Sequence, residues 1–305
     1  MKGIDLFSGA GGTSCGAELA GVNIIWAANH NPPAVAIHAL NHPNTIHACQ
    51  DLHQQDWNEI PRDFDIVYGS PCCQGHSIAT GKVKRSYKAD KSRSTAWAIV
   101  SCVENHKTPI VIIENVTDFL KWELYDAWSY AMKALGYSLS LNTLNAADFG
   151  VPQRRVRLFI VATRSANPID LKFEKKEHIP ARTIIDTNFD GHKWDLVSNR
   201  VAATQNRVKN GRNKFGSLFL DAAYGGEIGG RSLDKPIGTI MTVNKHSLVH
   251  GDYIRPITVA EQAAAQSFPS NYVFPKSQTL AKMMIGNAVP PLLAKSVTQA
   301  VLAAA

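Results

Sequence analysis

The chain has 305 residues, of which 45% are hydrophobic, and its formal net charge at pH 7 is +7. No apolar run reaches the ~18–20 residues of a membrane span, and the first residues lack the long apolar stretch of a signal peptide. The composition therefore argues against a membrane protein and predicts a soluble, cytoplasmic one. The excess positive charge favours polyanionic partners, nucleic acid above all.

The cysteines are odd in number and include no Cys-x-x-Cys pair. This spacing argues against a disulfide framework and against a zinc site, so we expect no bound metal. The five cysteines are Cys15, Cys49, Cys72, Cys73 and Cys102.

The first half of the chain alternates short apolar strands with amphipathic helices. Such alternation predicts βαβ units, and therefore an α/β fold with a mostly parallel sheet that helices cover on both faces. The expected strands are residues 3–7, 23–29, 45–49, 64–70, 109–116, 138–146 and 156–164. The expected helices are residues 13–21, 32–42, 92–106 and 118–137, and the expected C-cap of the last is Gly136.

Polar or reactive residues follow most of these strands directly. They are Ser8 to Gly12, Asn29, Asp51, the pair Cys72 and Cys73, and Glu114 with Asn115. Ligands of parallel α/β sheets bind outside the carboxyl ends of the strands. We therefore expect these residues to line one edge of the sheet and to form the functional site.

From about residue 164 the regular alternation stops, and Gly, Asn and basic residues become frequent. We expect a smaller, irregular second domain over residues 164–254, after a first domain over 1–163 to which residues 255–305 return. Two basic stretches rich in turn-forming residues, 79–94 and 199–217, are expected to be loops. Thr258 and Glu261 predict a capping box, and Pro290 and Pro291 suit the first turn of a final helix.

The stretch DLFSGAGG, residues 5–12, is a glycine cluster between a strand and a helix. Glycines let a ligand approach the backbone, and the helix that follows offers free N–H groups. This favours a nucleoside-bearing cofactor, although an ordinary tight turn has the same pattern. It is not the GxGxxG pattern of dinucleotide-binding proteins, which disfavours an NAD-dependent dehydrogenase.

Glu114 ends an otherwise apolar strand, where burial would raise the pKa of its carboxyl group and suit it to donate a proton. Arg155 and Arg157 are two residues apart, so a strand would place both on one face. Taken alone, Glu114 is a weak signal, because a Glu at a strand end also pairs with a nearby Arg. Taken alone, the two arginines favour the start of a basic surface strand over a site.

In GSPCCQGHS, residues 69–77, two cysteines end a predicted strand. A thiolate at such a turn is a competent nucleophile, since nearby helix N-termini lower its pKa. Neighbouring strand residues face opposite sides, so only one cysteine of the pair should face the site. Periodicity leaves open which one.

Taken in order, these motifs together with RPITVAEQAAAQSFP and IGNAVPP resemble those of the cytosine-C5 DNA methyltransferases, over the whole chain except the middle domain. The resemblance implies a Rossmann-like S-adenosylmethionine-dependent sheet with a target-recognition domain. The register of Gln74, Gly75 and Ser77 places Cys73 on the family's nucleophile. Cys72 then replaces the usual proline, so its turn must be held in some other way.

Other departures from the family pattern are His76 in place of an aromatic residue, Asn29 in place of Glu, and Gln50-Asp51-Leu52 in place of Gly-Asp-Ile. Asn29 could still bond the cofactor's ribose hydroxyls, without a charge. Asp51 would meet the adenine amino group. We expect His76 to substitute for the usual ring; assistance to the thiolate is the alternative.

The resemblance assigns roles residue by residue. The implied catalytic residues are Cys73, Glu114, Arg155 and Arg157. The implied cofactor-binding residues are Asp5, Leu6, Phe7, Ser8, Gly9, Gly11, Gly12, Asn29, His30, Asp51, Leu52, Pro71, Asn287 and Val289. The implied DNA-binding residues are Gln74, Ser77, Lys82, Lys84, Arg85, Arg93, Arg207, Lys209, Arg212 and Lys214.

The implied reaction is methyl transfer from S-adenosylmethionine to carbon 5 of a flipped-out cytosine in double-stranded DNA, through a covalent cysteine adduct, with S-adenosylhomocysteine as product. The implied protein is a monomer of prokaryotic or phage origin, and a restriction endonuclease would be a functional partner without necessary contact. An RNA cytosine methyltransferase and a catalytically inactive DNA-binding relative are the alternatives. The long recognition segment argues against the first, and the retained Cys73, Glu114 and Arg157 argue against the second.

Overall fold

The computed structural model describes residues 1–72, 94–224, 226 and 228–304, and these form two compact units. Unit 1 comprises residues 1–145, 156–174 and 289–305, and unit 2 comprises residues 146–155 and 175–288. Both units are discontinuous in sequence, because the chain enters unit 2 at two places. Among the described residues, no helix is long and apolar enough to cross a membrane.

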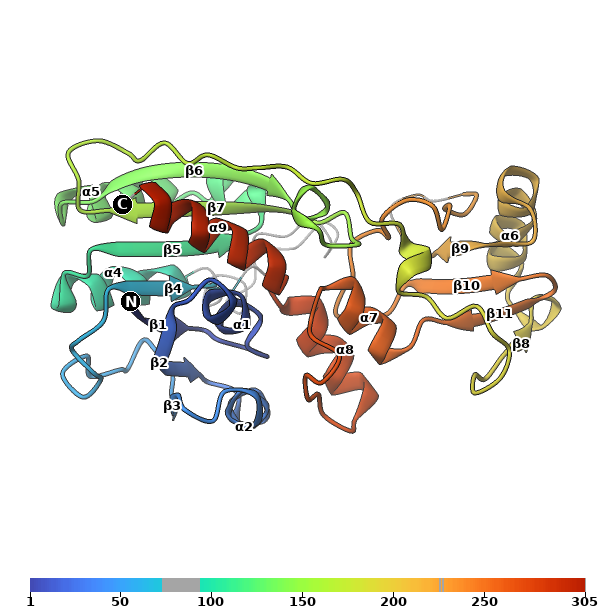
Figure 1. Cartoon of the computed structure of the whole chain (residues 1–305), viewed down its shortest axis with the longest axis horizontal. Coiled ribbons are helices and arrows are strands. Elements are labelled where there is room, and N and C mark those ends of the chain that lie inside the picture. The colour runs from blue at the N-terminus through green and yellow to red at the C-terminus, as the bar shows by residue number, and fades with distance from the viewer. Residues whose placement is uncertain (73–93, 225, 227, 305) are drawn as a thin grey trace. The chain divides into compact units, whose positions relative to one another are not determined.

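Unit 1 is built on a seven-stranded sheet with the strand order β3-β2-β1-β4-β5-β7-β6 (Figure 1). Its first five strands pair in parallel, and β7 runs antiparallel to both of its neighbours, β5 and β6. This confirms the predicted mostly parallel sheet. The strands are β1 (Lys2–Leu6), β2 (Asn23–Asn29), β3 (Ile46–Cys49), β4 (Ile66–Gly69), β5 (Ile110–Asn115), β6 (Ser138–Asn145) and β7 (Val156–Thr163).

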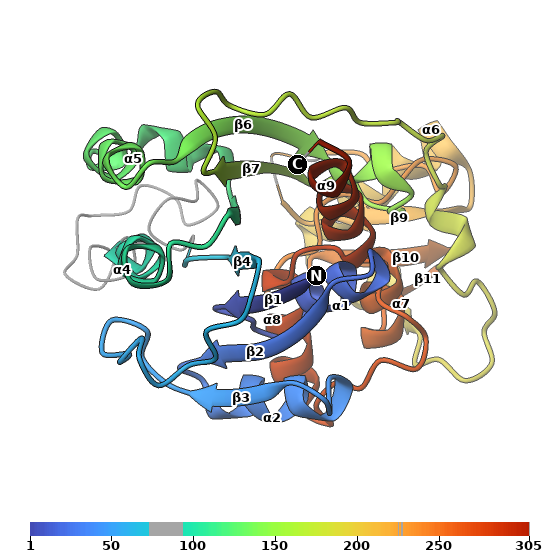
Figure 2. The same ribbon diagram turned by 60° about the vertical axis from the view of Figure 1, so that its left-hand side comes forward.

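Helices cover both faces of this sheet (Figure 2). On one face, Ile4 and Leu6 of β1 share a buried cluster with Ile99 of α4 (Trp97–His106) and Trp128 of α5 (Tyr125–Ala134). On the other face lie α1 (Gly12–Leu19) and α9 (Pro291–Ala304), which approach closely at Gly16. A Cβ atom there would come within 2.5 Å of the Cβ of Ala294. Helix α2 (Pro32–Asn41) packs beside β2 and β3.

The single helix predicted over residues 118–137 is wrong. The 3-10 turns η2 (Ser94–Ala96) and η3 (Thr117–Lys121) precede α4 and α5, and the chain becomes extended at Trp122, with φ −67° and ψ 130°. The break lets the rings of Phe119, Trp122 and Trp128 pack together, with centroids 5.6 Å apart for Phe119 and each of the two tryptophans. Burial of these rings outweighs the helical propensity of the segment. Gly136, with φ +89°, follows the end of α5 as predicted.

Unit 2 contains a four-stranded antiparallel sheet with the order β8-β11-β10-β9. Its strands are β8 (Asp195–Leu196), β9 (Leu218–Ala222), β10 (His246–His250) and β11 (Tyr253–Pro256). Its helices are α6 (Ala202–Phe215), α7 (Val259–Ala265) and α8 (Gln278–Asn287), and its 3-10 turns are η4 (Ala146–Phe149), η5 (Ala181–Thr183) and η6 (Val197–Asn199). The region predicted to be irregular therefore contains a regular sheet, while residues 164–180 and 184–194 of it form neither helix nor strand.

The loop predicted over residues 199–217 is also wrong, because most of that stretch forms α6. Its Asn and Gly residues are poor helix formers, so propensity alone suggests a loop. Burial of Val208 and Gly211 against Phe219 of β9 stabilises the helix instead.

Residues 255–288 belong to unit 2, whereas the sequence suggested that they return to the first domain. The reason is that α7 and α8 contribute Ala263, Ala265 and Ile285 to a buried cluster with Leu220 of β9 and Leu248 of β10. Only residues 289–305 join unit 1.

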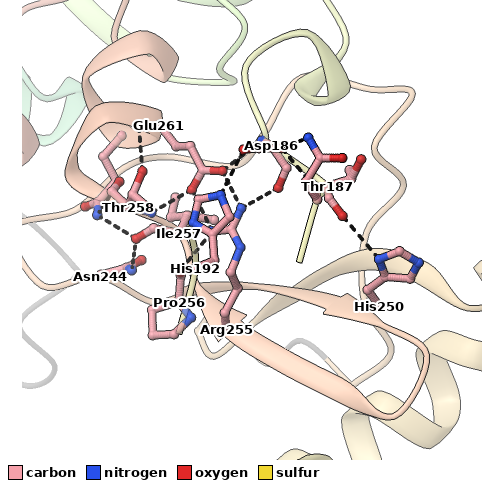
Figure 3. Close-up of polar contacts among 12 residues, drawn as sticks. Asp186, Thr187, His192, Asn244, His250, Arg255, Pro256, Ile257, Thr258 and Glu261 are labelled. Atoms are coloured by element: carbon pink, nitrogen blue, oxygen red, sulfur yellow. Dashed lines mark hydrogen bonds and ion pairs between the residues drawn. The ribbon is translucent and has the colours of Figure 1, made fainter. Parts of the chain in front are cut away.

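The predicted capping box is present at the start of α7 (Figure 3). The side chain of Thr258 accepts from the N–H of Glu261, and the Glu261 carboxylate accepts from the N–H of Thr258. The same carboxylate binds the Arg255 guanidinium through both oxygens, at 2.6 and 2.9 Å. Burial opposes ionisation of Glu261, but these hydrogen bonds outweigh it and lower its pKa. This buried pair joins β11 to α7.

Candidate active site

The carboxyl ends of the parallel strands in unit 1 lie in register along one edge of the sheet. Leu6 pairs with Ala28 on one side and with Gly69 on the other, and Gly69 pairs with Ile113. The strand order reverses between β1 and β4, which is where ligands of such sheets bind. The residues that follow β1, β2, β4 and β5 are therefore neighbours at this edge, as the sequence predicted.

The turn after β1 has a backbone with repeated positive φ angles, which is strained at Phe7. Phe7, Gly9 and Gly11 have positive φ values of 66°, 56° and 88°. Ser8 ties the turn to β2, because its N–H donates to the Ala28 carbonyl at 3.0 Å. Gly11 is the N-cap of α1 and offers no capping side chain, so the N–H groups of the first helical turn can meet a ligand.

Asp5 and Leu6 have no exposed side chain, so only their backbone could face a ligand in that turn. The Asp5 carboxylate accepts from Ser14 Oγ of α1 at 2.6 Å. Burial raises the pKa of Asp5 to about 7, although the hydrogen bonds from Ser14 counteract the shift. Asp5 thus fixes the start of α1 against β1 and supports the glycine turn from behind.

A chain of histidines, in which His38 and His42 are buried and His47 is half-buried, continues from Ser14. Nε2 of His38 lies 3.0 Å from Ser14 Oγ, and Nδ1 of His38 lies 2.8 Å from Nε2 of His47. His42 stacks on His38 with 4.4 Å between ring centroids, and its Nδ1 lies 3.0 Å from the Glu18 carboxylate. Burial lowers the pKa of His38 to about 2, so its ring is neutral at physiological pH.

The ends of β2 and β3 carry two further polar groups. Oδ1 of Asn29 accepts from the N–H of Asn31 at 3.0 Å, which fixes the side chain and leaves its NH2 group as the part that can donate to a ligand. Oδ1 of Asp51 accepts from the N–H of His53 at 3.1 Å. His30 is exposed, whereas Leu52 is buried in the core of unit 1 and supports the Asp51 turn.

The turn after β4 is held by three hydrogen bonds. Ser70 N–H donates to the Leu6 carbonyl at 3.2 Å, and Nδ2 of Asn115 donates to the Pro71 carbonyl at 3.2 Å. The N–H of Cys72 donates to Oγ1 of Thr95 at 3.0 Å. A proline at position 72 would lack this N–H, so Thr95 is the partner that stabilises the turn in place of proline's rigidity.

At the end of β5, Glu114 forms an ion pair with Arg157 of β7, with 3.0 Å between Arg157 Nε and Glu114 Oε1. Both side chains are largely buried, at 13% and 14% exposed. Arg157 lies near the start of the antiparallel strand β7, where it pairs with Leu144 of β6 on its other side. The pair orients a carboxylate at the same edge as the glycine turn.

Arg155 does not share a strand face with Arg157, so that prediction is wrong. Strand β7 begins at Val156, and Arg155 lies in unit 2. Its buried guanidinium donates to the carbonyls of Ile240 at 3.0 Å and of Gly286 at 2.9 Å. Within unit 2 it therefore links three separate segments of the backbone.

The other predicted residues fall into three groups. Asn287 ends α8 with an exposed side chain, and Val289 is buried in unit 1. Four predicted DNA-binding residues, Arg207, Lys209, Arg212 and Lys214, lie on α6. The rest lie outside the described residues, together with His76: Cys73, Gln74, Ser77, Lys82, Lys84, Arg85 and Arg93.

Comparison with known proteins decides the family. The family model of C-5 cytosine-specific DNA methylases matches residues 1–303. The chain belongs to this methylase family. The methylase is 29% identical over 325 residues to the Type II methyltransferase M1.HphI of Haemophilus parahaemolyticus, a match that covers 98% of this chain and 86% of that protein. It is 27% identical to M.HindV of Haemophilus influenzae, covering 99% of this chain and 96% of that protein.

The fold of the methylase is shared with solved structures at lower identity. A protein encoded within an E. coli prophage superposes with a TM-score of 0.74 at 20% identity, over 100% of this chain and 99% of that one. A mutant of Spodoptera frugiperda DNMT2 superposes with a TM-score of 0.75 at 16% identity, over 99% of each chain. Both confirm the α/β fold of the methylase.

Two parts of the methylase's site escaped sequence reasoning. Thr95 lies 23 residues from Cys72, and a lone threonine gives no signal of its partner. The hydrogen-bonded chain from Asp5 to His47 has a weak sequence signal. His38 lies in an apolar helix and His42 directly follows it, and because they are four residues apart they share a face. Histidines on an apolar face require polar partners, which α1 supplies: Ser14 for His38 and Glu18 for His42.

Proposed function

We propose that this methylase transfers the methyl group of S-adenosylmethionine to carbon 5 of a cytosine flipped out of double-stranded DNA, through a covalent adduct with Cys73. The observation that carries the proposal is the largely buried Glu114–Arg157 pair. It lies at the sheet edge where the glycine turn after β1 and the Pro71–Cys72 turn after β4 also lie. This reaction needs a binding site for a nucleoside cofactor, a nucleophilic cysteine and an oriented carboxylate.

The reaction requires activation of the base, because carbon 5 of cytosine is too electron-poor to attack an electrophilic methyl group. The Cys73 thiolate adds to carbon 6, and N3 takes a proton as electrons move into the ring. Carbon 5, now enamine-like, takes the methyl group. A base then removes the carbon 5 proton, the bond from carbon 6 to sulfur breaks as the double bond between carbons 5 and 6 re-forms, and the thiolate is restored. The proton on N3 returns to the group that supplied it, which leaves neutral 5-methylcytosine.

Glu114 would bind the base at N3 and at its exocyclic amine and supply the proton to N3. Arg157 would fix the orientation of that carboxylate, through the 3.0 Å contact, and bind the cytosine O2. The cytosine edge cannot reach these groups inside a stacked duplex, so the base must leave the helix.

The residues at the edge fit the cofactor that the family implies. S-adenosylmethionine supplies an electrophilic methyl group and leaves as S-adenosylhomocysteine. The open first turn of α1 suits its carboxylate. The NH2 group of Asn29 suits the ribose hydroxyls, and the Asp51 carboxylate suits the adenine amine. Phe7, Ser8, Gly9, Gly11, Gly12, His30, Pro71, Asn287 and Val289 are the further positions that the family resemblance assigns to it.

Unit 2 would select the DNA sequence, and the basic stretch 79–94, with Lys82, Lys84 and Arg85, would contact phosphates. The enzyme would act as a soluble cytoplasmic monomer. The Type II relatives suggest a restriction endonuclease that shares its target and need not touch it.

Methylation of host DNA tests the proposal. The wild type, expressed in a host without cytosine methylation, should leave 5-methylcytosine in one short context on bisulfite sequencing. Cys73→Ala should leave none, while it still binds S-adenosylmethionine and DNA. Cys72→Ala keeps the N–H that Thr95 accepts and is the matched control, so it should remain active. An active Cys73→Ala beside an inactive Cys72→Ala would contradict the assignment of the nucleophile.

A further inference from the structure

Helix α6 of unit 2 packs against the antiparallel sheet (Figure 1). A Cβ atom on Gly211 would come 2.2 Å from the Phe219 ring, so the helix lies directly on β9. Arg207 binds the buried Asp221 carboxylate through two nitrogens, at 2.8 and 2.9 Å. Arg212 binds the Gly251 carbonyl at 2.7 Å. The helix is therefore held in one orientation.

The opposite face of α6 carries an exposed stripe, whose polar members are Asn206, Lys209 and Asn213. At 100° per residue, Ala202, Asn206, Lys209 and Asn213 fall within an arc of about 60°, opposite the buried Gly211. All four are exposed. From Asn206 to Asn213 the stripe is roughly 10 Å long, which corresponds to about three base-pair steps of B-DNA.

The charge around this stripe has one sign. No Asp or Glu occurs between Leu196 and Leu220. The arginines on the flanks of α6 are engaged, Arg207 with Asp221 and Arg212 with Asp252. Within the described part of the chain, no carboxylate contacts Lys209. Its charge is therefore available to an anionic or electron-rich partner.

An ordinary solvated helix face would not look like this one. Solvated faces mix charges of both signs and use good helix formers. Asparagine in a helix costs about 0.5 kcal/mol relative to alanine. Asn210 is explained by its hydrogen bond to the Ile228 carbonyl at 2.8 Å. Among the described residues, the exposed side chains of Asn206 and Asn213 have no such bond, so both amides are open to an external ligand.

We propose that α6 enters the major groove of the DNA substrate and that Asn206, Lys209 and Asn213 contact base edges there. The proposal rests on the proposed function, since it needs a sequence-specific DNA methylase. The major groove admits an α-helix, asparagine amides pair with N6 and N7 of adenine, and lysine pairs with O6 and N7 of guanine. The stripe thus selects purines over about four consecutive base pairs.

The test is the methylation pattern of host DNA under Lys209→Ala and under the double variant Asn206→Ala/Asn213→Ala. Each should lower the ratio of methylation at the wild-type context to that at singly altered contexts by at least about fivefold. Both variants replace exposed side chains with a better helix former, so they should fold as the wild type does. Lys133→Ala/Asn271→Ala removes the same chemical groups from exposed positions outside α6 and should leave the pattern unchanged.

The possible results distinguish a failure of the α6 proposal from a failure of the proposed function. A wild type that methylates no cytosine overturns the proposed function, and the role of α6 with it. A wild type with one clear context whose α6 variants keep that context overturns the role of α6 alone. That role is also overturned if Lys209→Ala only weakens binding of all duplexes equally and lowers the salt slope by about 1, because that is the behaviour of a phosphate contact.

Discussion

The hydrogen-bonded chain from Asp5 through Ser14 and His38 to His47 makes Asp5→Asn an informative substitution. Burial raises the pKa of Asp5 to about 7 and lowers that of His38 to about 2. The ordinary values are about 3.9 for Asp and 6.5 for His. Between about pH 4 and pH 6.5, the folded protein thus holds a proton on Asp5 that the unfolded chain has lost. Over the same range the unfolded chain holds a proton on His38 that the folded protein has lost.

These two groups act on stability with opposite signs. The raised pKa of Asp5 makes the free energy of unfolding fall as pH rises towards about 7, by about 1.36 kcal/mol per pH unit. The lowered pKa of His38 makes the same free energy rise with pH, up to about 6.5, by the same amount. In the wild type, the two slopes offset each other.

Asp5→Asn removes the pH dependence of stability that comes from Asp5 and leaves the one that comes from His38. The amide oxygen of asparagine can still accept from Ser14, but the side chain no longer titrates. The variant should therefore gain about 3 kcal/mol of stability relative to the wild type between pH 4.5 and pH 6.5. Urea unfolding at both pH values, followed by tryptophan fluorescence, measures this difference.

Two further variants complete the experiment. His38→Gln removes the opposite slope, so its stability relative to the wild type should fall over the same pH range. Asp63→Asn changes an exposed carboxylate, 89% exposed, and serves as the control. Parallel stability curves for the wild type and Asp5→Asn would refute the raised pKa of the buried Asp5 carboxyl group.

Three other experiments test individual contacts. Cys72→Pro removes the N–H that Thr95 accepts and should cost about 1 kcal/mol in the free energy of unfolding; Thr95→Ala should cost less in that background than in the wild type, and additive effects in this double-mutant cycle would contradict the contact. Asn29→Ala should weaken S-adenosylmethionine binding about two- to tenfold by equilibrium dialysis without changing kcat at saturation, and an unchanged affinity would remove Asn29 from the site. Arg155→Met leaves two buried carbonyls without their donor and should cost about 3 kcal/mol of stability, whereas Arg157→Met should lose methyl transfer first; an inactive but fully stable Arg155→Met would contradict the structural role.

The sheet edge was predictable because each strand ends at a clear change in chemistry. Short apolar runs stop at the glycine cluster after Leu6, at Asn29, at the Cys72 turn and at Glu114. The parallel topology then brings those ends together whatever happens in the loops. The pairing register of β1, β2, β4 and β5 confirms this inference.

The errors arose where tertiary contacts decide the local structure. Helix α6 contains poor helix formers and is stabilised by Phe219, which follows it in the chain. The break at Trp122 depends on the rings of Phe119 and Trp128. The spacing of Arg155 and Arg157 predicted a shared face, but the strand begins after Arg155, whose guanidinium binds carbonyls 85 and 131 residues away in sequence. None of these partners can be identified from a local pattern.

The central claim is that Cys73 attacks carbon 6 of cytosine. A duplex with the methylated context and 5-fluorocytosine at the target position tests it directly, because fluorine cannot leave as a proton does and the adduct persists. After incubation with S-adenosylmethionine and digestion, peptide mass spectrometry should find the methylated fluorocytosine on Cys73, and Cys73→Ala should form no adduct. An adduct on Cys72, or methyl transfer to normal duplex by Cys73→Ala, would contradict the account.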